Sequence, residues 1–96
     1  MKQAESTLLI EREEVRVSDW HLAPGEHTGE HRHGFDYVVV PITDGLLRSV
    51  AADGVSEIPL APGKAYFRKA GVEHDVINAG TKPLRFIEIE LKDRPG

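Results

Sequence analysis

Polar and apolar positions alternate with a period of two along much of this chain. Val15 and Val17 alternate with Glu14, Arg16 and Ser18, a pattern typical of a half-buried strand. Residues 35–40 are rich in β-branched and aromatic side chains, which pack well on a pleated sheet. No segment has the 3.6-residue period of an amphipathic helix. The pattern therefore predicts an all-β protein.

The remaining apolar runs and turn signals divide the chain into short strands. Asp44-Gly45 and Asp53-Gly54 are typical of hairpin turns, and Pro41 is expected to end its strand or to place it at an edge. Leu-Ala-Pro-Gly occurs at 22–25 and again at 60–63, which suggests two related halves. Further strands are predicted at residues 7–10, 46–51, 55–60, 65–68, 74–78 and 84–91. Together they indicate a sandwich or barrel that forms one domain over residues 1–96.

Composition narrows the class of protein. The 96 residues carry a net charge of −4 and no cysteine, so disulfides and thiolate metal sites are excluded. No run of basic residues is present, which argues against nucleic-acid binding. No secretory signal is visible and no apolar run is long enough to span a bilayer, which argues against a membrane protein. We expect a soluble, cytoplasmic protein.

Three histidines are the candidate metal ligands. His31 and His33 are two residues apart, so on a strand they point the same way with their Cα atoms roughly 7 Å apart. His74 would join them from a distant strand. Imidazole suits zinc, copper, iron and nickel, and three histidines that leave positions open are typical of a catalytic rather than a structural site. His21 is expected at the surface, and His27 lies either there or at the mouth of the site.

Both histidine segments resemble the two motifs of the cupin superfamily. Gly25, His31 and His33 match the start of the first motif, and Gly45 falls close to its closing glycine. The second motif is matched by Gly63, Gly71, His74 and Asn78. The resemblance implies a small jelly-roll β-barrel with a metal inside, and a homodimer. The sequence around residues 37–41 is also similar to that of small single-domain cupins assigned to β-alanine degradation.

This sequence departs from the family pattern at two positions. Lys69 replaces the proline of the second motif, which should alter the turn but not the ligand. The glutamate ligand of the first motif is missing, and the count from His33 falls on Tyr37 or Val38. Strand alternation places Tyr37 on the face of His33, where its hydroxyl would bond a metal-bound water or the substrate; core packing is the alternative. Asp36 would point away unless a bulge re-aims it as a ligand.

The missing carboxylate affects the expected ligand. Three neutral imidazoles leave the charge of a divalent ion uncompensated, so we expect a small anionic, carboxylate-bearing molecule. Glu73 is a candidate hydrogen-bond partner for an imidazole N–H. No general base stands out, and His27, Tyr37 and Glu30 are candidates without further support. Residues that could line the cavity or contact an acid are Arg48, Tyr66, Phe67 and Arg68. Each of these side chains could equally belong to the barrel wall or to a solvated face.

These features favour a metal-dependent enzyme, with a dioxygenase among the reactions that fit. The metal would be iron, zinc, nickel or manganese. The alternative is a non-catalytic cupin that binds or senses a small molecule while holding a divalent metal. A barrel without metal is disfavoured by the intact His31, His33 and His74. For the homodimer, we expect an apolar face on residues 38–40 or 86–91 to be covered by the second copy.

Overall fold

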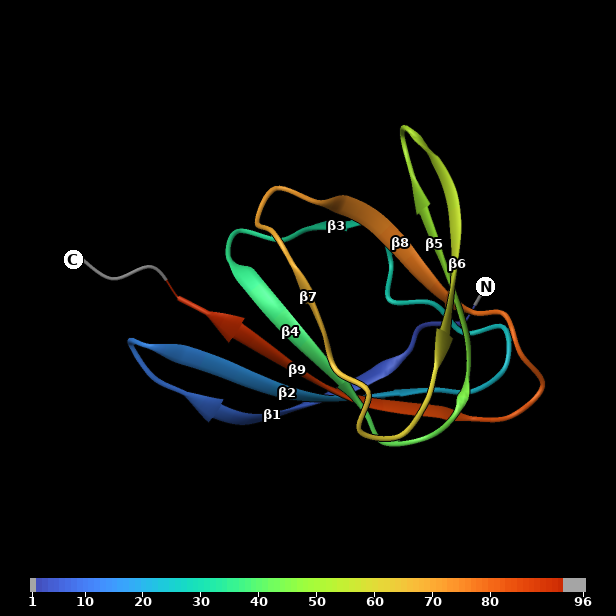
Figure 1. Ribbon diagram of the computed structural model, residues 1–96, viewed down its shortest axis with the longest axis horizontal. Coiled ribbons are helices and arrows are strands. Elements are labelled where there is room, and N and C mark those ends of the chain that lie inside the picture. The colour runs from blue at the N-terminus through green and yellow to red at the C-terminus, as the bar shows by residue number, and fades with distance from the viewer. Residues whose placement is uncertain (1, 93–96) are drawn as a thin grey trace.

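The computed structural model describes residues 2–92, which form strands and no helix (Figure 1). Within these residues no helix is long and apolar enough to cross a membrane. The strands are β1 (Glu5–Glu11), β2 (Val15–Leu22), β3 (His31–Arg32), β4 (Asp36–Pro41), β5 (Gly45–Ala51), β6 (Gly54–Leu60), β7 (Tyr66–Arg68), β8 (Glu73–Asn78) and β9 (Leu84–Leu91). The predicted all-β class is confirmed, and each predicted strand is present within a few residues.

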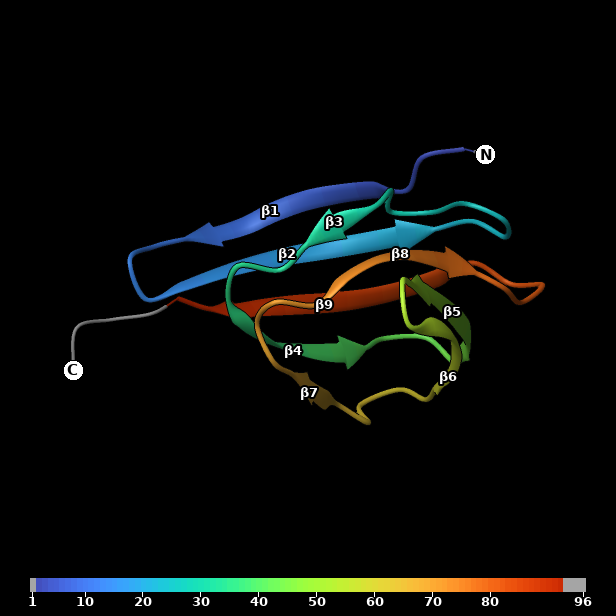
Figure 2. The same ribbon diagram turned by 90° about the horizontal axis from the view of Figure 1, so that it is seen from above.

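The strands form two antiparallel sheets that face each other. The larger sheet has the order β1-β2-β9-β4-β7 and the smaller one β3-β8-β5-β6. Figure 2 shows the larger sheet in this order, with β3 and β8 lying across it. Consecutive pairs such as β4 and β5 belong to different sheets, so the chain crosses repeatedly between the two layers. This is the arrangement of a jelly roll.

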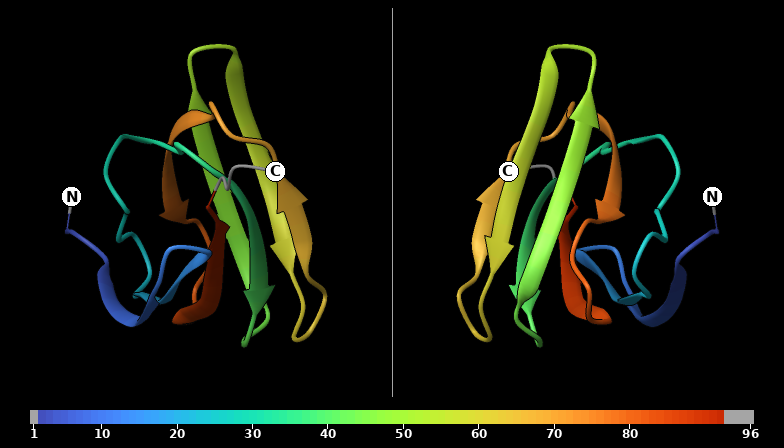
Figure 3. Two further views of the ribbon diagram at one scale, coloured as in Figure 1. Left: turned by 90° about the vertical axis from the view of Figure 1, so that its left-hand side faces the viewer. Right: turned by 90° about the vertical axis from the view of Figure 1, so that its right-hand side faces the viewer.

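One of the two predicted hairpins is correct. Asp53-Gly54 lies where β5 turns back into β6, and Ala51 pairs with Gly54; Figure 3 shows this hairpin projecting beyond the rest of the barrel. Asp44-Gly45 does not form a hairpin, because β4 and β5 lie in different sheets. Gly45 is instead a point of close packing, since a Cβ there would lie 2.2 Å from the Leu84 side chain.

The repeated Leu-Ala-Pro-Gly segments have equivalent structural roles. Leu22 ends β2 and Leu60 ends β6, and both side chains are buried. The glycine that follows each of them has a positive φ, 82° at Gly25 and 76° at Gly63, a conformation that glycine adopts without steric cost. Each copy therefore ends a strand and reverses the chain at one end of the barrel.

The core lies between the sheets and is made of the inward-facing residues of both. The even-numbered residues of β9 contribute Leu84 and Phe86, and β4 contributes Tyr37 and Val39. The other buried apolar side chains are Leu22, Leu47, Leu60 and Val76. Trp20 packs against this core, with its ring stacked 6.5 Å from that of Phe86. The apolar side chains fill one part of the barrel and leave the histidines at another.

The two segments proposed to be covered by a second copy lie inside the larger sheet. Residues 38–40 and 86–91 belong to β4 and β9, which have a neighbouring strand on each side. The edge strands are β1 and β7, and all seven residues of β1 are exposed. Three adjacent apolar side chains on it, Leu8, Leu9 and Ile10, are each about half exposed. A surface for a second copy is therefore sought on β1.

Candidate metal centre

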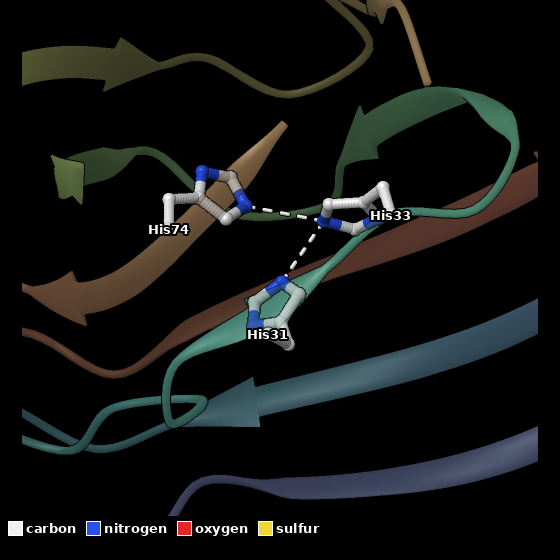
Figure 4. A group of neighbouring side chains, drawn as sticks. All are labelled: His31, His33 and His74. Atoms are coloured by element: carbon white, nitrogen blue, oxygen red, sulfur yellow. Dashed lines mark hydrogen bonds between the residues drawn. The ribbon is translucent and has the colours of Figure 1, made fainter. Parts of the chain in front are cut away.

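The three predicted histidines lie together inside the barrel. His31 is on β3 opposite His74 of β8, and His33 follows β3 directly. Figure 4 shows the three rings pointing toward one another. The Nε2 atoms of His31 and His33 are 2.9 Å apart, and those of His33 and His74 are 3.1 Å apart. The long-range pairing of β3 with β8 thus joins the two motifs.

The outer ring nitrogens of two of these histidines already have partners. The Nδ1–H of His31 donates to the carbonyl oxygen of Gly29 at 2.7 Å, so its Nε2 carries a lone pair. The Nδ1 of His74 lies 2.9 Å from the hydroxyl of Ser49 on β5. Such contacts fix the tautomer and the ring orientation of a metal-binding histidine. Glu73, the partner predicted from sequence, is exposed and makes no such contact among the described residues.

The imidazoles of His33 and His74 are held neutral, which metal binding requires. Burial lowers the pKa of His33 to about 4, and the nearby His31 and His74 add to the effect. Burial likewise lowers the pKa of His74 to about 4, with contributions from His31 and Arg68. His33 Nε2 carries at most one proton yet faces two other ring nitrogens. Two nitrogens bound at right angles to one ion at ~2.1 Å would be ~3.0 Å apart, so the donor set fits a divalent metal.

The backbone of His33 is fixed to the turn between β7 and β8. Its N–H donates to Val72 O at 2.9 Å, and its carbonyl accepts from Gly71 N at 2.8 Å. Asp36 acts on the same turn, where its carboxylate accepts from Ala70 N at 2.8 Å. Asp36 therefore points away from the three histidines, as regular alternation predicts, and no bulge turns it inward.

Tyr37 lies on the inner face beside His33, as its alternation predicts. The two rings are stacked, with centroids 3.9 Å apart and planes 18° from parallel. Tyr37 is buried, and burial is the main cause that raises the pKa of its phenol. The phenol therefore stays protonated at neutral pH and holds the His33 ring from one side.

Three other candidates from the sequence lie outside this cluster. His27 Nδ1 contacts Asp75 at 2.9 Å, and Asp75 also accepts from Gly29 N, so this pair fastens the loop that leads to His31. Arg48 is paired with Glu57 on the neighbouring strand. Asn78 is buried, and its amide donates to the carbonyls of Leu22 and Lys82. These are structural contacts rather than contacts with the histidines.

A cavity of about 340 Å³, including its open mouth, adjoins the three histidines. Its remaining lining is mostly aromatic and apolar: Trp20, Thr28, Tyr37, Val39, Leu47, Tyr66, Val76, Phe86 and Glu88. Phe67 points outward and is about half exposed. The guanidinium of Arg68 lies 5.0 Å from the centre of the Tyr66 ring. Of the four residues proposed to line the cavity, Tyr66 does so.

Glu88 is the one carboxylate in this lining, and the sequence analysis missed it. It lies on β9 between Ser18 and Val39, and one of its oxygens is within 4.8 Å of a ring nitrogen of His33. Burial raises the pKa of Glu88 to about 7, and Glu90 adds to the shift. Its position two residues after Phe86 was the available signal, but Ile87 and Ile89 make both faces of β9 partly apolar. The alternation alone therefore does not say which face is inward.

Known proteins with similar sequence or structure agree with this architecture. A family profile described as "Cupin domain" matches residues 18–90. The chain is 53% identical over 90 residues to the "Beta-alanine degradation protein BauB" of Pseudomonas aeruginosa, covering 94% of this chain and 95% of that protein. The crystal structure of a cupin domain from Bordetella pertussis has 43% identity, 96% coverage of both chains and a TM-score of 0.92.

A more distant likeness shows the fold alone. The polyketide cyclase RemF of Streptomyces resistomycificus is 19% identical, with a TM-score of 0.71 over 99% of this chain and 71% of that one. The fold, the two motifs and the matched profile lead to one conclusion: this chain is a small single-domain member of the cupin family.

Proposed function

We propose that this cupin is a metal-dependent enzyme that acts on a small carboxylate-bearing molecule. His31, His33 and His74 would hold a divalent metal. The observation that carries the proposal is the convergence of their Nε2 atoms, 2.9 and 3.1 Å apart, while the Nδ1 atoms of His31 and His74 are occupied by Gly29 and Ser49. Iron, zinc, nickel or manganese would suit this donor set. The bound metal would supply Lewis-acid activation of the substrate or, as iron, binding of both substrate and O₂.

The charge of the ligands supports an acidic substrate. All three metal ligands are neutral, so an anionic oxygen donor would compensate the ion. The name of the Pseudomonas aeruginosa relative assigns that protein to β-alanine degradation, and β-alanine is itself a small carboxylate.

Tyr37 has a proposed role in this site. It lines the cavity and is stacked on His33, and its phenol can donate a hydrogen bond to a bound ligand because it remains protonated. Replacing Tyr37 with Phe keeps the ring on His33 and removes the hydroxyl. We expect unchanged metal content and a lower turnover, and equal turnover would assign Tyr37 to packing alone.

Metal analysis of untagged protein tests the proposal. Wild type would be compared with a variant in which His31, His33 and His74 are all Ala. Near-stoichiometric iron that the variant lacks, followed by O₂ uptake with small acids, would support an oxygenase. Stoichiometric zinc or nickel without turnover would favour the non-catalytic binding protein. No bound metal after reconstitution with several divalent ions would refute the metal site.

The homodimer stays a prediction, and we propose β1 as the surface that the second copy would cover. This strand exposes the backbone edge of the larger sheet together with Leu8, Leu9 and Ile10. Pairing with a second copy would cover both the edge and these side chains. Light scattering on wild type and on an Ile10→Lys variant tests it: a dimer that becomes a monomer supports this surface, and a monomeric wild type refutes it.

A further inference from the structure

The cavity beside the three histidines has two chemically different walls. β3 and β8 supply imidazoles with lone pairs, whereas the opposite sheet supplies Glu88, Trp20 and Phe86. Glu88 lies beside His33 rather than among the three converging nitrogens, since it forms a separate group with His33 and Glu90. A ligand bound at the histidines therefore has a carboxylate of the protein next to it.

Glu88 has no cation of the protein as a direct partner among residues 2–92. Arg16 makes its hydrogen bonds with Glu11 and Glu90, and its effect on the pKa of Glu88 is the smallest of the causes. Burial of this carboxylate is therefore uncompensated within the described part of the chain. The metal proposed at His33 would compensate part of this charge, and a positive charge on a ligand would compensate the rest.

The rest of this wall also suits a cation. Trp20 and Phe86 present aromatic rings to the cavity, and Tyr66 adds a third. Aromatic faces attract ammonium groups, most strongly when these are removed from water. The indole N–H of Trp20 is buried and has no hydrogen-bond partner of normal geometry among the described residues. It still lowers the pKa of Glu88, against the larger raising effect of burial. The indole therefore lies close to the carboxylate and can accompany it in contacting a ligand.

We propose that Glu88, with the aromatic rings of Trp20 and Phe86, forms a subsite for an ammonium group, so that the ligand is a small zwitterion. Its carboxylate would face the metal end of the cavity and its ammonium would face Glu88. The inference rests on the proposed function and narrows its substrate class. A simple anion would meet the charge of Glu88, whereas in a short amino acid each end meets the opposite charge.

The single tryptophan provides the readout. Its indole N–H gives one ¹H–¹⁵N signal beside Glu88. Zinc-reconstituted protein, with its metal content measured first, would be titrated with β-alanine and with butyrate, in which a methyl group replaces the ammonium. We expect β-alanine to bind about ten-fold more tightly than butyrate. Equal affinities in wild type would overturn the proposal.

Variants identify the group responsible for the preference. Glu88→Gln keeps the shape and removes the charge, so the ten-fold preference for β-alanine should disappear while the zinc content is unchanged. Glu90→Gln is the matched control, since Glu90 is on the same face but already paired with Arg16, and it should keep the preference. A preference that persists in Glu88→Gln would overturn the assignment.

The same titrations separate this inference from the metal site. If wild type binds zinc but does not prefer β-alanine, the ammonium subsite fails and the metal centre stands. If wild type binds no metal, the proposed function fails, and ethylammonium, a cation without a carboxylate, then tests Glu88 alone. A shift of the Trp20 signal that is lost in Glu88→Gln would support the subsite, and an equal response in both proteins would refute it.

Discussion

Both walls of the cavity place polar side chains inward by strand alternation, but the side chains differ in charge and in how they are held. On both, strand alternation turns polar side chains inward, with His74 on β8 and Glu88 on β9. The histidine wall is braced, because Gly29 and Ser49 hold the outer nitrogens of His31 and His74. Glu88 has no comparable brace among the described residues. Burial keeps the imidazoles of His33 and His74 neutral and favours the protonated form of Glu88. A barrel interior can thus hold one wall ready for a cation while the other carries a charge that burial destabilises.

Removing a histidine from the metal site should have the largest effect, which is on metal affinity. His33→Ala removes the ring that contacts both other Nε2 atoms, so we expect metal affinity to fall more than ~100-fold. Competition with a chelator measures it. His21→Ala is the control, because His21 is exposed on β2 and outside the cavity, and it should bind metal as wild type does. Unchanged affinity in His33→Ala would place the metal elsewhere.

Neutralising the opposite wall should stabilise the metal-free protein at high pH. Glu88 has a pKa of about 7 when folded against an ordinary value of 4.5, so its stabilising contribution is present at low pH and lost as pH rises through about 7. Glu88→Gln should therefore be more stable than wild type by ~3 kcal/mol at pH 8. At pH 4, below both pKa values of Glu88, the two should be nearly equal. Denaturant unfolding at both pH values measures this, and a pH-independent difference would contradict it.

The histidine wall should give a pH dependence of the opposite sign. His33 and His74 have pKa values of about 4 when folded against 6.5 ordinarily, so the unfolded chain binds more protons between these values. The contribution of these two histidines to the free energy of unfolding is present above pH 6.5 and is lost as the pH falls toward 4. Glu88→Gln, which lacks the opposing titration, should accordingly lose stability more steeply than wild type over this range.

Weakening a brace should have a smaller effect than removing a ligand. Ser49→Ala removes the hydroxyl that contacts His74 Nδ1 at 2.9 Å and leaves all three imidazoles in place. We expect metal affinity to fall about ten-fold, the lower end for such supporting contacts. Chelator competition with Ser56→Ala as control measures it, since Ser56 lies on β6 and is exposed. An equal loss in both variants would argue against a specific brace.

The smallest effect is expected at Asp36. Asp36→Asn keeps an acceptor oxygen for Ala70 N but removes the charge from this hydrogen bond, so stability should fall by about 1 kcal/mol or less. Metal affinity should change less than about three-fold, since Asp36 faces away from the histidines. Thermal unfolding and chelator competition measure the two quantities. A loss of metal comparable to that in His33→Ala would restore Asp36 as a ligand.

Much of the fold and the histidine cluster could be predicted, because both depend on short spacings. The period of two placed the strands, and the i, i+2 spacing with the second motif brought His31, His33 and His74 together. Features that depend on packing between distant segments could not be predicted from the sequence. Asp44-Gly45 looks like a hairpin signal, yet Gly45 is required where the Leu84 side chain packs against its backbone. Glu88 was missed because the pairing of β9 with β2 and β4, rather than its own pattern, decides which face is inward.

The backbone clamp on His33 has a kinetic consequence. Its N–H and carbonyl are both bonded to the turn at Gly71 and Val72, so its backbone cannot move away while the turn stays paired, and the stacked Tyr37 ring opposes rotation of its side chain. Release of a bound ion would then wait for local opening of the turn rather than for rotation of a side chain. The dissociation half-life of the metal and the hydrogen-exchange rate of the His33 amide should therefore change together when the turn is loosened.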